Sequence, residues 1–171
     1  ARRRDHPRGA ELSRGGVVAV PEALTEAFSE AECAWVLALS AANEIETGPL
    51  DREKLLHLVA ESFSARVVRP ASGYLLTFSP DAQIEGPNFS WFKARGGRFI
   101  YVDRIVVAAA ARGQGLARLL YQELFAKAAE AGFDEVTCEV NRDPPNPISD
   151  QFHAALGFVP VGTALLPNGK T

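Results

Sequence analysis

The fold is decided by residues 99–132, which read FIYVDRIVVAAAARGQGLARLLYQELFAKAAEAG. The first part of this stretch, Phe99–Val107, is rich in β-branched and aromatic residues, which is typical of a buried strand. The last part, residues 116–131, carries apolar side chains at helical spacing and ends at Gly132. A strand, a glycine-containing loop and a long helix in this order predict an α/β domain.

The loop between this strand and this helix holds Arg112, Gly113, Gln114 and Gly115. Glycine lets a backbone approach an anion closely, and the first turn of a helix offers unpaired N–H groups and a partial positive charge. With the Arg112 guanidinium beside them, these groups are suited to a pyrophosphate. The alternative is a plain strand-to-helix turn, because a short glycine pair is a weak signal. The loop also lacks the third glycine of a dinucleotide-binding turn and the Lys-Ser/Thr pair of a P-loop.

Capping signals predict three further helices. Ser29 and Glu32 form a capping box ahead of one helix, and Asp51 is placed to cap a second. Asn146 is followed by a proline, so it should cap a short helix over residues 147–156.

Residues 80–98 are rich in turn formers and too long for a hairpin connection, so we expect a loop there. In the strand that follows, alternation places Tyr101, Asp103, Ile105 and Val107 on one face. The other predicted strands cover residues 16–20, 64–69, 73–79, 135–141 and 158–166.

Composition limits the class of protein. Hydrophobic residues make up 47% and charged residues 23%, as in an average soluble domain. No apolar run approaches the roughly 18–20 residues that span a bilayer, so we expect no membrane partner. Two distant cysteines without clustered histidines predict neither a disulfide nor a zinc site, and a reduced, cytoplasmic setting.

Charge is distributed unevenly along the chain. Residues 1–14 carry a net charge of +3, while the remainder carries −6. We therefore expect a basic, disordered arm over residues 1–14 and one domain over residues 15–171. A short basic arm on an acidic body is a poor nucleic-acid binder, so we expect no nucleic acid as a partner.

The glycine loop and a second motif downstream together resemble a known family. Residues 112–117, RGQGLA, resemble the acetyl-CoA pyrophosphate motif R/Q-x-x-G-x-G/A of the GNAT N-acetyltransferase superfamily. Ile105-Val-Val107 resembles the fourth strand of that family. Asn146, the helix after it and Leu156-Gly-Phe158 resemble its second motif. Within the superfamily, the sequence is similar to a bacterial subgroup of predicted acetyltransferases.

The resemblance implies an α/β (α+β) fold with a single mixed, mainly antiparallel sheet flanked by helices. This sheet would be splayed between its fourth and fifth strands, with acetyl-CoA in the gap. The Val107 N–H would face the thioester oxygen as an oxyanion hole. Asn146 would contact the pantetheine arm, serve as a helix cap, or do both. The implied acetyl-CoA-binding residues are Ile105, Val106, Val107, Arg112, Gly113, Gln114, Gly115, Leu116, Ala117 and Asn146.

Amine acetylation requires a neutral nucleophile, and protonation of the departing thiolate assists it. The resemblance places Asp103 where many relatives carry an acidic residue, so Asp103 is the candidate base. The alternative is a structural partner for Arg104, Arg98 or a backbone N–H. Tyr101 is the fallback, as a substrate contact. His153 stands where the family carries a tyrosine acid, so it is either a proton donor or a packed imidazole.

Three residues ahead of the central strand, Asn88, Trp91 and Phe92, are expected to line the acceptor site. Aromatic rings suit a cationic or planar substrate. Alternatively, Trp91 and Phe92 only seal the core where the sheet splays.

We therefore expect an N-acetyltransferase that moves the acetyl group of acetyl-CoA to a small-molecule or peptide amine by direct attack, without a metal. One alternative is a non-catalytic acyl-CoA-binding regulatory module, and another is a nucleotide-binding switch domain. Residues 158–166 should form a sixth strand, and residues 167–170 a hairpin turn. The last strand would then be truncated, so we expect either further chain or the partner of a homodimer to cover this sheet edge.

Overall fold

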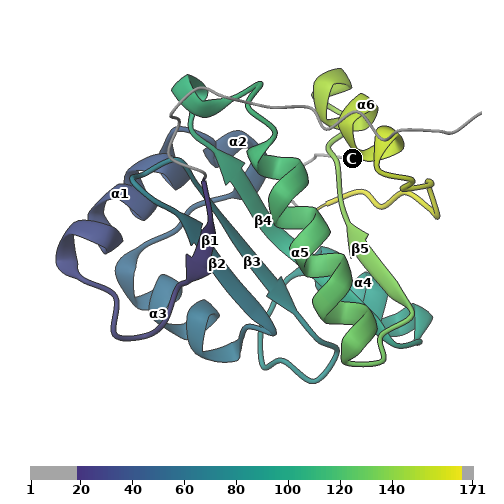
Figure 1. Ribbon diagram of the computed structural model, residues 1–171. Coiled ribbons are helices and arrows are strands. Elements are labelled where there is room, and N and C mark those ends of the chain that lie inside the picture. The colour runs from purple at the N-terminus through teal and green to yellow at the C-terminus, as the bar shows by residue number, and fades with distance from the viewer. Residues whose placement is uncertain (1–18, 167–171) are drawn as a thin grey trace, which may run out of the picture.

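The computed structural model describes residues 19–166, so the expected arm over residues 1–14 and the expected turn over residues 167–170 lie outside the described residues. The described part is one mixed sheet with helices on both faces (Figure 1). The strands lie in the order β1-β2-β3-β4-β5, with antiparallel neighbours except for the parallel pair β4 and β5. The predicted fold class is therefore confirmed. The strands are β1 (Pro21–Ala23), β2 (Ser64–Val68), β3 (Gly73–Phe78), β4 (Phe99–Val107) and β5 (Glu135–Cys138).

The helices begin where the capping signals predict. The Ser29 hydroxyl accepts a hydrogen bond from the Glu32 N–H at 3.1 Å, and Asp51 caps the third helix in the same way. Asn146 accepts from the Ser149 N–H at 3.2 Å, so its role as a helix cap is confirmed. The helices are α1 (Glu30–Ala41), α2 (Glu44–Thr47), α3 (Arg52–Glu61), α4 (Pro87–Arg95), α5 (Leu116–Glu130) and α6 (Pro147–Ala155), with a 3₁₀ turn at Ala109–Ala111.

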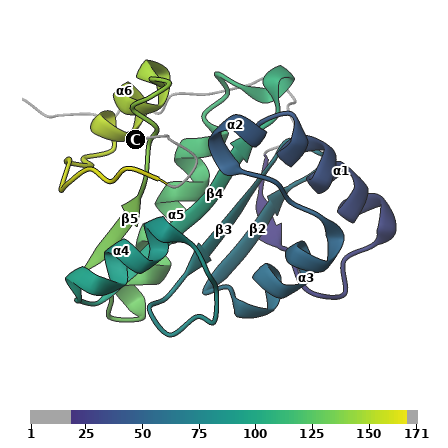
Figure 2. The ribbon, with the colours of Figure 1, turned by 180° about the vertical axis from the view of Figure 1, so that it is seen from behind.

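Each face of the sheet has its own apolar core. Helix α5 covers one face, where Leu120 and Leu124 are fully buried with residues of the central strands (Figure 1). Helices α1, α3 and α4 cover the other face, where Val36, Leu55 and Phe89 are buried (Figure 2). Burial of these side chains holds the two layers together.

Two expected segments differ from the structure near the ends of the described chain. The first strand begins at Pro21, whereas Ala19 and Val20 of the predicted strand lie outside it. The expected strand over residues 158–166 is not formed. Pro160 has no N–H to donate to a ladder, and Gly162 packs against the Trp91 ring instead.

Residues 80–98 are not a loop throughout, because α4 occupies Pro87–Arg95. Pro87 stands at the start of this helix, where its missing N–H costs nothing. Phe89 and Phe92 lie three residues apart and are both buried against the sheet. Their spacing is that of one helix face.

Candidate active site

The central feature is a fork between the parallel strands β4 and β5. Their pairing runs from Phe99 opposite Glu135 to Val102 opposite Cys138 and then stops, although β4 continues to Val107. Beyond the last pair, this edge of β4 has no further strand partner among residues 19–166. The implied splay between the fourth and fifth strands is thus confirmed.

A bulge in β4 changes which side chains face the fork. Asp103 is an extra residue, because its two neighbours pair with consecutive residues of β3. Tyr101 packs in the core with α4, whereas Ile105 and Val107 pack on the α5 side. The prediction that Tyr101, Ile105 and Val107 share a face is therefore wrong. The backbone roles implied for Ile105, Val106 and Val107 stay predictions.

The loop after β4 has the shape of an anion cradle. Gly113 and Gly115 adopt φ angles of 76° and 79°, a conformation that favours glycine, and a Cβ on either would point into open space. Helix α5 begins at the next residue, so the free N–H groups of its first turn lie beside the cradle. Residues from Arg112 to Ala117 thus fit a pyrophosphate, which they would hold through backbone amides.

The Arg112 side chain is held by hydrogen bonds to the end of β4 and to the residue that precedes α2. Its Nε donates to the Val107 carbonyl at 3.3 Å, and its terminal nitrogen donates to the Asn43 side chain at 3.0 Å. Gln114 donates to the Ala110 carbonyl at 3.3 Å. These contacts tie the end of β4, the cradle and the α1–α2 junction together.

Glu139, which the sequence analysis missed, stands directly after the last β5 pair. Its Oε1 accepts a hydrogen bond from the Tyr101 hydroxyl at 2.9 Å, while its Oε2 is shielded from solvent without a partner among the described residues. Burial raises the pKa of Glu139 from 4.5 to about 7, the hydrogen bond from Tyr101 opposes this shift, and the Asp103 charge adds to it. One sequence signal pointed here: the carboxyl end of a parallel strand is a common place for functional residues.

Asp103 faces a different environment on the other arm of the fork. Burial raises its pKa, and the Arg104 guanidinium opposes this effect from 3.0 Å. Arg104 is itself buried and also donates to the Ser40 hydroxyl and the Gly48 carbonyl. The structural partnership with Arg104 is therefore present, and a catalytic role for Asp103 stays a prediction.

His153, on α6, is buried between aromatic rings. Its Nδ1 lies 2.8 Å from the Ser149 carbonyl, so this nitrogen must carry the proton. Its Nε2 then accepts from the Tyr121 hydroxyl at 2.8 Å. Burial lowers the pKa of His153, which favours the neutral ring. The histidine lies in the wall of the cleft described next, and its role as a proton donor stays a prediction.

A cleft of about 370 Å³ opens beside Glu139, between α4, α6 and residues 158–166. The three expected acceptor-site residues, Asn88, Trp91 and Phe92, all line it. The Trp91 ring is covered in part by the Arg95 guanidinium, 5.2 Å from the ring centre. Gly162 also packs against Trp91, because a Cβ added to Gly162 would come within 2.6 Å of the ring. Trp91 therefore supports the segment that walls the cleft.

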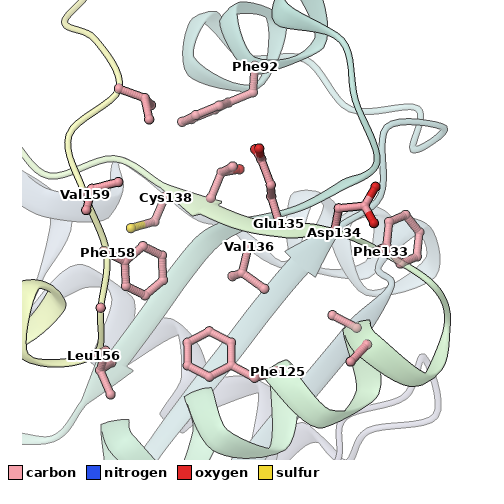
Figure 3. A pocket seen from close by; sticks show the side chains of 15 residues that line it. Phe92, Phe125, Phe133, Asp134, Glu135, Val136, Cys138, Leu156, Phe158 and Val159 are labelled. Atoms are coloured by element: carbon pink, nitrogen blue, oxygen red, sulfur yellow. The ribbon is translucent and has the colours of Figure 1, made fainter.

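A second hollow, of about 460 Å³, follows the open edge of β5. In Figure 3 the strand passes between Phe92 on one side and Phe125 on the other, with Val136 turned toward Phe125. Phe92, Cys138 and Phe158 line both hollows, so the two adjoin. Neither Glu139 nor His153 lines the second hollow, so it is not where the candidate acid and base meet.

Residues 19–166 contain neither a candidate metal cluster nor a candidate membrane-spanning helix. No cluster of three or more His, Cys, Asp or Glu residues could hold a metal ion there. None of the described helices has the length and apolarity needed to cross a membrane.

Comparison with known structures agrees with this geometry. A ribosomal-protein-alanine N-acetyltransferase from Brucella melitensis biovar Abortus 2308 superposes with a TM-score of 0.61 at 18% identity, covering 86% of this chain and 96% of that chain. A chain of the NatC complex bound to Gag peptide and CoA gives 0.67 at 15% identity, covering 88% and 92%. AAC(6')-Iy, in complex with a bisubstrate analogue, gives 0.61 at 16% identity, covering 86% and 95%.

At these identities the superpositions show a shared fold and nothing finer. No curated protein matches the sequence significantly. The sequence profile of the Acetyltransferase (GNAT) family, however, matches residues 52–158, which include the fork, the cradle and Glu139. The chain therefore belongs to the GNAT acetyltransferase family.

Proposed function

We propose that this protein transfers the acetyl group of acetyl-CoA to a primary amine by direct attack, with Glu139 as the general base. The observation that carries the proposal is the fork, where the shielded Glu139 carboxylate directly follows the last β5 pair and the anion cradle follows the end of β4. Family membership and the fold of CoA-bound relatives support acetyl-CoA as the donor.

Glu139 has the properties that a base for an ammonium needs. Its pKa of about 7 leaves a large fraction ionised near neutral pH, yet lets it hold a proton once taken. Oε2, which has no partner among the described residues, is the oxygen that would accept the amine proton. Oε1 keeps its hydrogen bond from Tyr101, which fixes the carboxylate. This assigns Tyr101 a positioning role.

The transfer balances without any further reagent. Acetyl-CoA supplies an activated thioester carbonyl, and the neutral amine forms a C–N bond to its carbon while the C–S bond breaks. Glu139 removes the amine proton, and the Val107 N–H is proposed to stabilise the developing oxyanion. The thiolate takes a proton from solvent, or from His153 after it exchanges one of its hydrogen bonds.

The test is release of free CoA from acetyl-CoA in the presence of a panel of primary amines. We expect amine-dependent release that is lost in Glu139→Gln while acetyl-CoA still raises the melting temperature. Acetyl-CoA binding without release for any amine would instead establish the regulatory module as the function. No thermal shift with acetyl-CoA would overturn both.

A further inference from the structure

We propose that the acceptor is a small primary amine carried on a single apolar, preferably aromatic, body, and that residues 158–166 select it. This inference rests on the acetyl transfer proposed above and adds the chemistry of the acceptor. It is drawn from the cleft beside Glu139, which this carboxylate lines together with apolar side chains of α4 and of residues 158–166.

Within the cleft, the Glu139 carboxylate offers one place for an amine. The Glu139 carboxylate is shielded, has one unpartnered oxygen within the described chain and lies against Tyr101 and the cleft. An amine nitrogen at this oxygen would be both held and deprotonated, so the nitrogen that reacts is the one that binds here.

The walls offer little to a second cation. Phe92, Phe158 and Val161 present apolar surface to the cleft. Besides Glu139, the charged residues among its described lining are Asp150 and Arg142, which have opposite signs. A second ammonium group on the acceptor would lose hydrating water when it contacts these apolar side chains. No net negative charge among Asp150 and Arg142 would compensate for that loss. An apolar body gains from the same walls.

The size of the cleft favours a small molecule. Its volume of about 370 Å³ is near the lower end of the roughly 300–1,000 Å³ found for small-ligand pockets. The segment over residues 158–166, with the exception of Leu165, lines one side of the cleft, and its Gly162 packs directly on Trp91. Because Arg95 lies over the Trp91 ring, this indole serves to hold the wall rather than to receive a substrate cation.

The experiment compares two charge substitutions in the same segment. Val161 and Leu165 are both exposed, at 52% and 76%, but only Val161 lines the cleft. Val161→Asp therefore adds a carboxylate to the acceptor wall, and Leu165→Asp adds the same charge outside it. Both variants and the parent are assayed for CoA release with phenethylamine, spermidine and the dipeptide Ala-Ala, and for thermal stabilisation by acetyl-CoA.

We expect the parent to favour phenethylamine over spermidine and the dipeptide by about tenfold or more in kcat/KM. Val161→Asp should lower the value for phenethylamine by about tenfold and raise that for spermidine, whereas Leu165→Asp should change neither. A parent that prefers spermidine or the dipeptide would overturn the acceptor class. Equal effects of the two substitutions would overturn selection by this segment. Absence of CoA release with every amine, despite intact acetyl-CoA stabilisation, would overturn the proposed transfer instead.

Discussion

At the scale of single residues, the two carboxylates at the fork differ in the groups that surround them. Asp103 is paired with the buried Arg104, while Glu139 has a hydroxyl donor on one oxygen and no partner in the described chain on the other. A carboxylate in an ion pair is already stabilised in its charged form, so it gains less by accepting a proton. This contrast is the reason that we propose Glu139, rather than Asp103, as the base.

The first prediction concerns the rate. Glu139→Gln keeps the shape of the side chain but cannot accept a proton, so kcat should fall by about 100-fold or more at neutral pH. In the parent, kcat should rise with pH through a pKa near 7, and the variant should lose this limb. The profile is measured by CoA release, with the exposed Glu135→Gln on β5 as the control.

Asp103→Asn separates the two candidate bases. If this variant, rather than Glu139→Gln, loses the limb near pH 7 while both still bind acetyl-CoA, Asp103 is the base and our assignment is wrong.

The second prediction concerns stability. Because burial raises the pKa of Glu139 from 4.5 to about 7, the folded protein binds more protons than the unfolded chain between these values. The contribution of Glu139 to the free energy of unfolding should therefore decrease as pH rises from about 4.5 to about 7. Relative to the parent, Glu139→Gln should gain stability over the same window. Chemical denaturation at several pH values measures this, and a difference that does not change with pH would contradict the shift.

At the scale of secondary structure elements, the junction of β4, the glycine loop and α5 carries the third prediction. Gly115→Glu places an anion and a side chain at a backbone with φ of 79°, next to the first turn of α5. Acetyl-CoA should then no longer raise the melting temperature, because its pyrophosphate would meet a like charge and a filled cradle. Glu130→Gln, at the other end of α5, serves as the control. Unchanged acetyl-CoA affinity in Gly115→Glu would rule out this cradle.

The same scale shows what could be predicted from the sequence. Elements with strong periodicity and capping side chains, such as α5 and the helices behind Ser29, Asp51 and Asn146, were predicted correctly because their signals are local. The bulge at Asp103 could not be predicted, because it depends on how β4 pairs with β3. Helix α4 was missed because the glycines on either side of it resemble a loop.

The candidate site divides in the same way. The cradle from Arg112 to Ala117 could be located from its glycines and the helix behind them. Glu139 could not, because its raised pKa arises from burial and from the Asp103 charge, and Asp103 is brought near only by the parallel pairing of β4 and β5. The contact of Gly162 with Trp91 likewise joins residues that are distant in the sequence.

At the scale of the whole molecule, the segment over residues 158–166 lines the cleft and packs against α4. The fourth prediction rests on this packing. In Gly162→Ala, the new Cβ would lie 2.6 Å from the Trp91 ring, so the wall must shift. The KM for the acceptor should rise by about tenfold, the equivalent of roughly 1.4 kcal/mol, while affinity for acetyl-CoA stays the same.

Gly86→Ala is the matched control, because a Cβ there meets open space. Steady-state kinetics for the acceptor, together with acetyl-CoA titration, separate the two substrates. An unchanged acceptor KM in Gly162→Ala would show that the position of this wall does not matter for the acceptor.

The contact between Gly162 and Trp91 also gives the protein a built-in optical reporter. The chain has two tryptophans, and the other, Trp35, lies on α1, where it is partly buried against the apolar core. In Trp35→Phe, all indole emission would come from the ring that supports the cleft wall. Its wavelength and its quenching by acrylamide should then follow the filling of the cleft by an amine, without a label and before any acetyl group has moved.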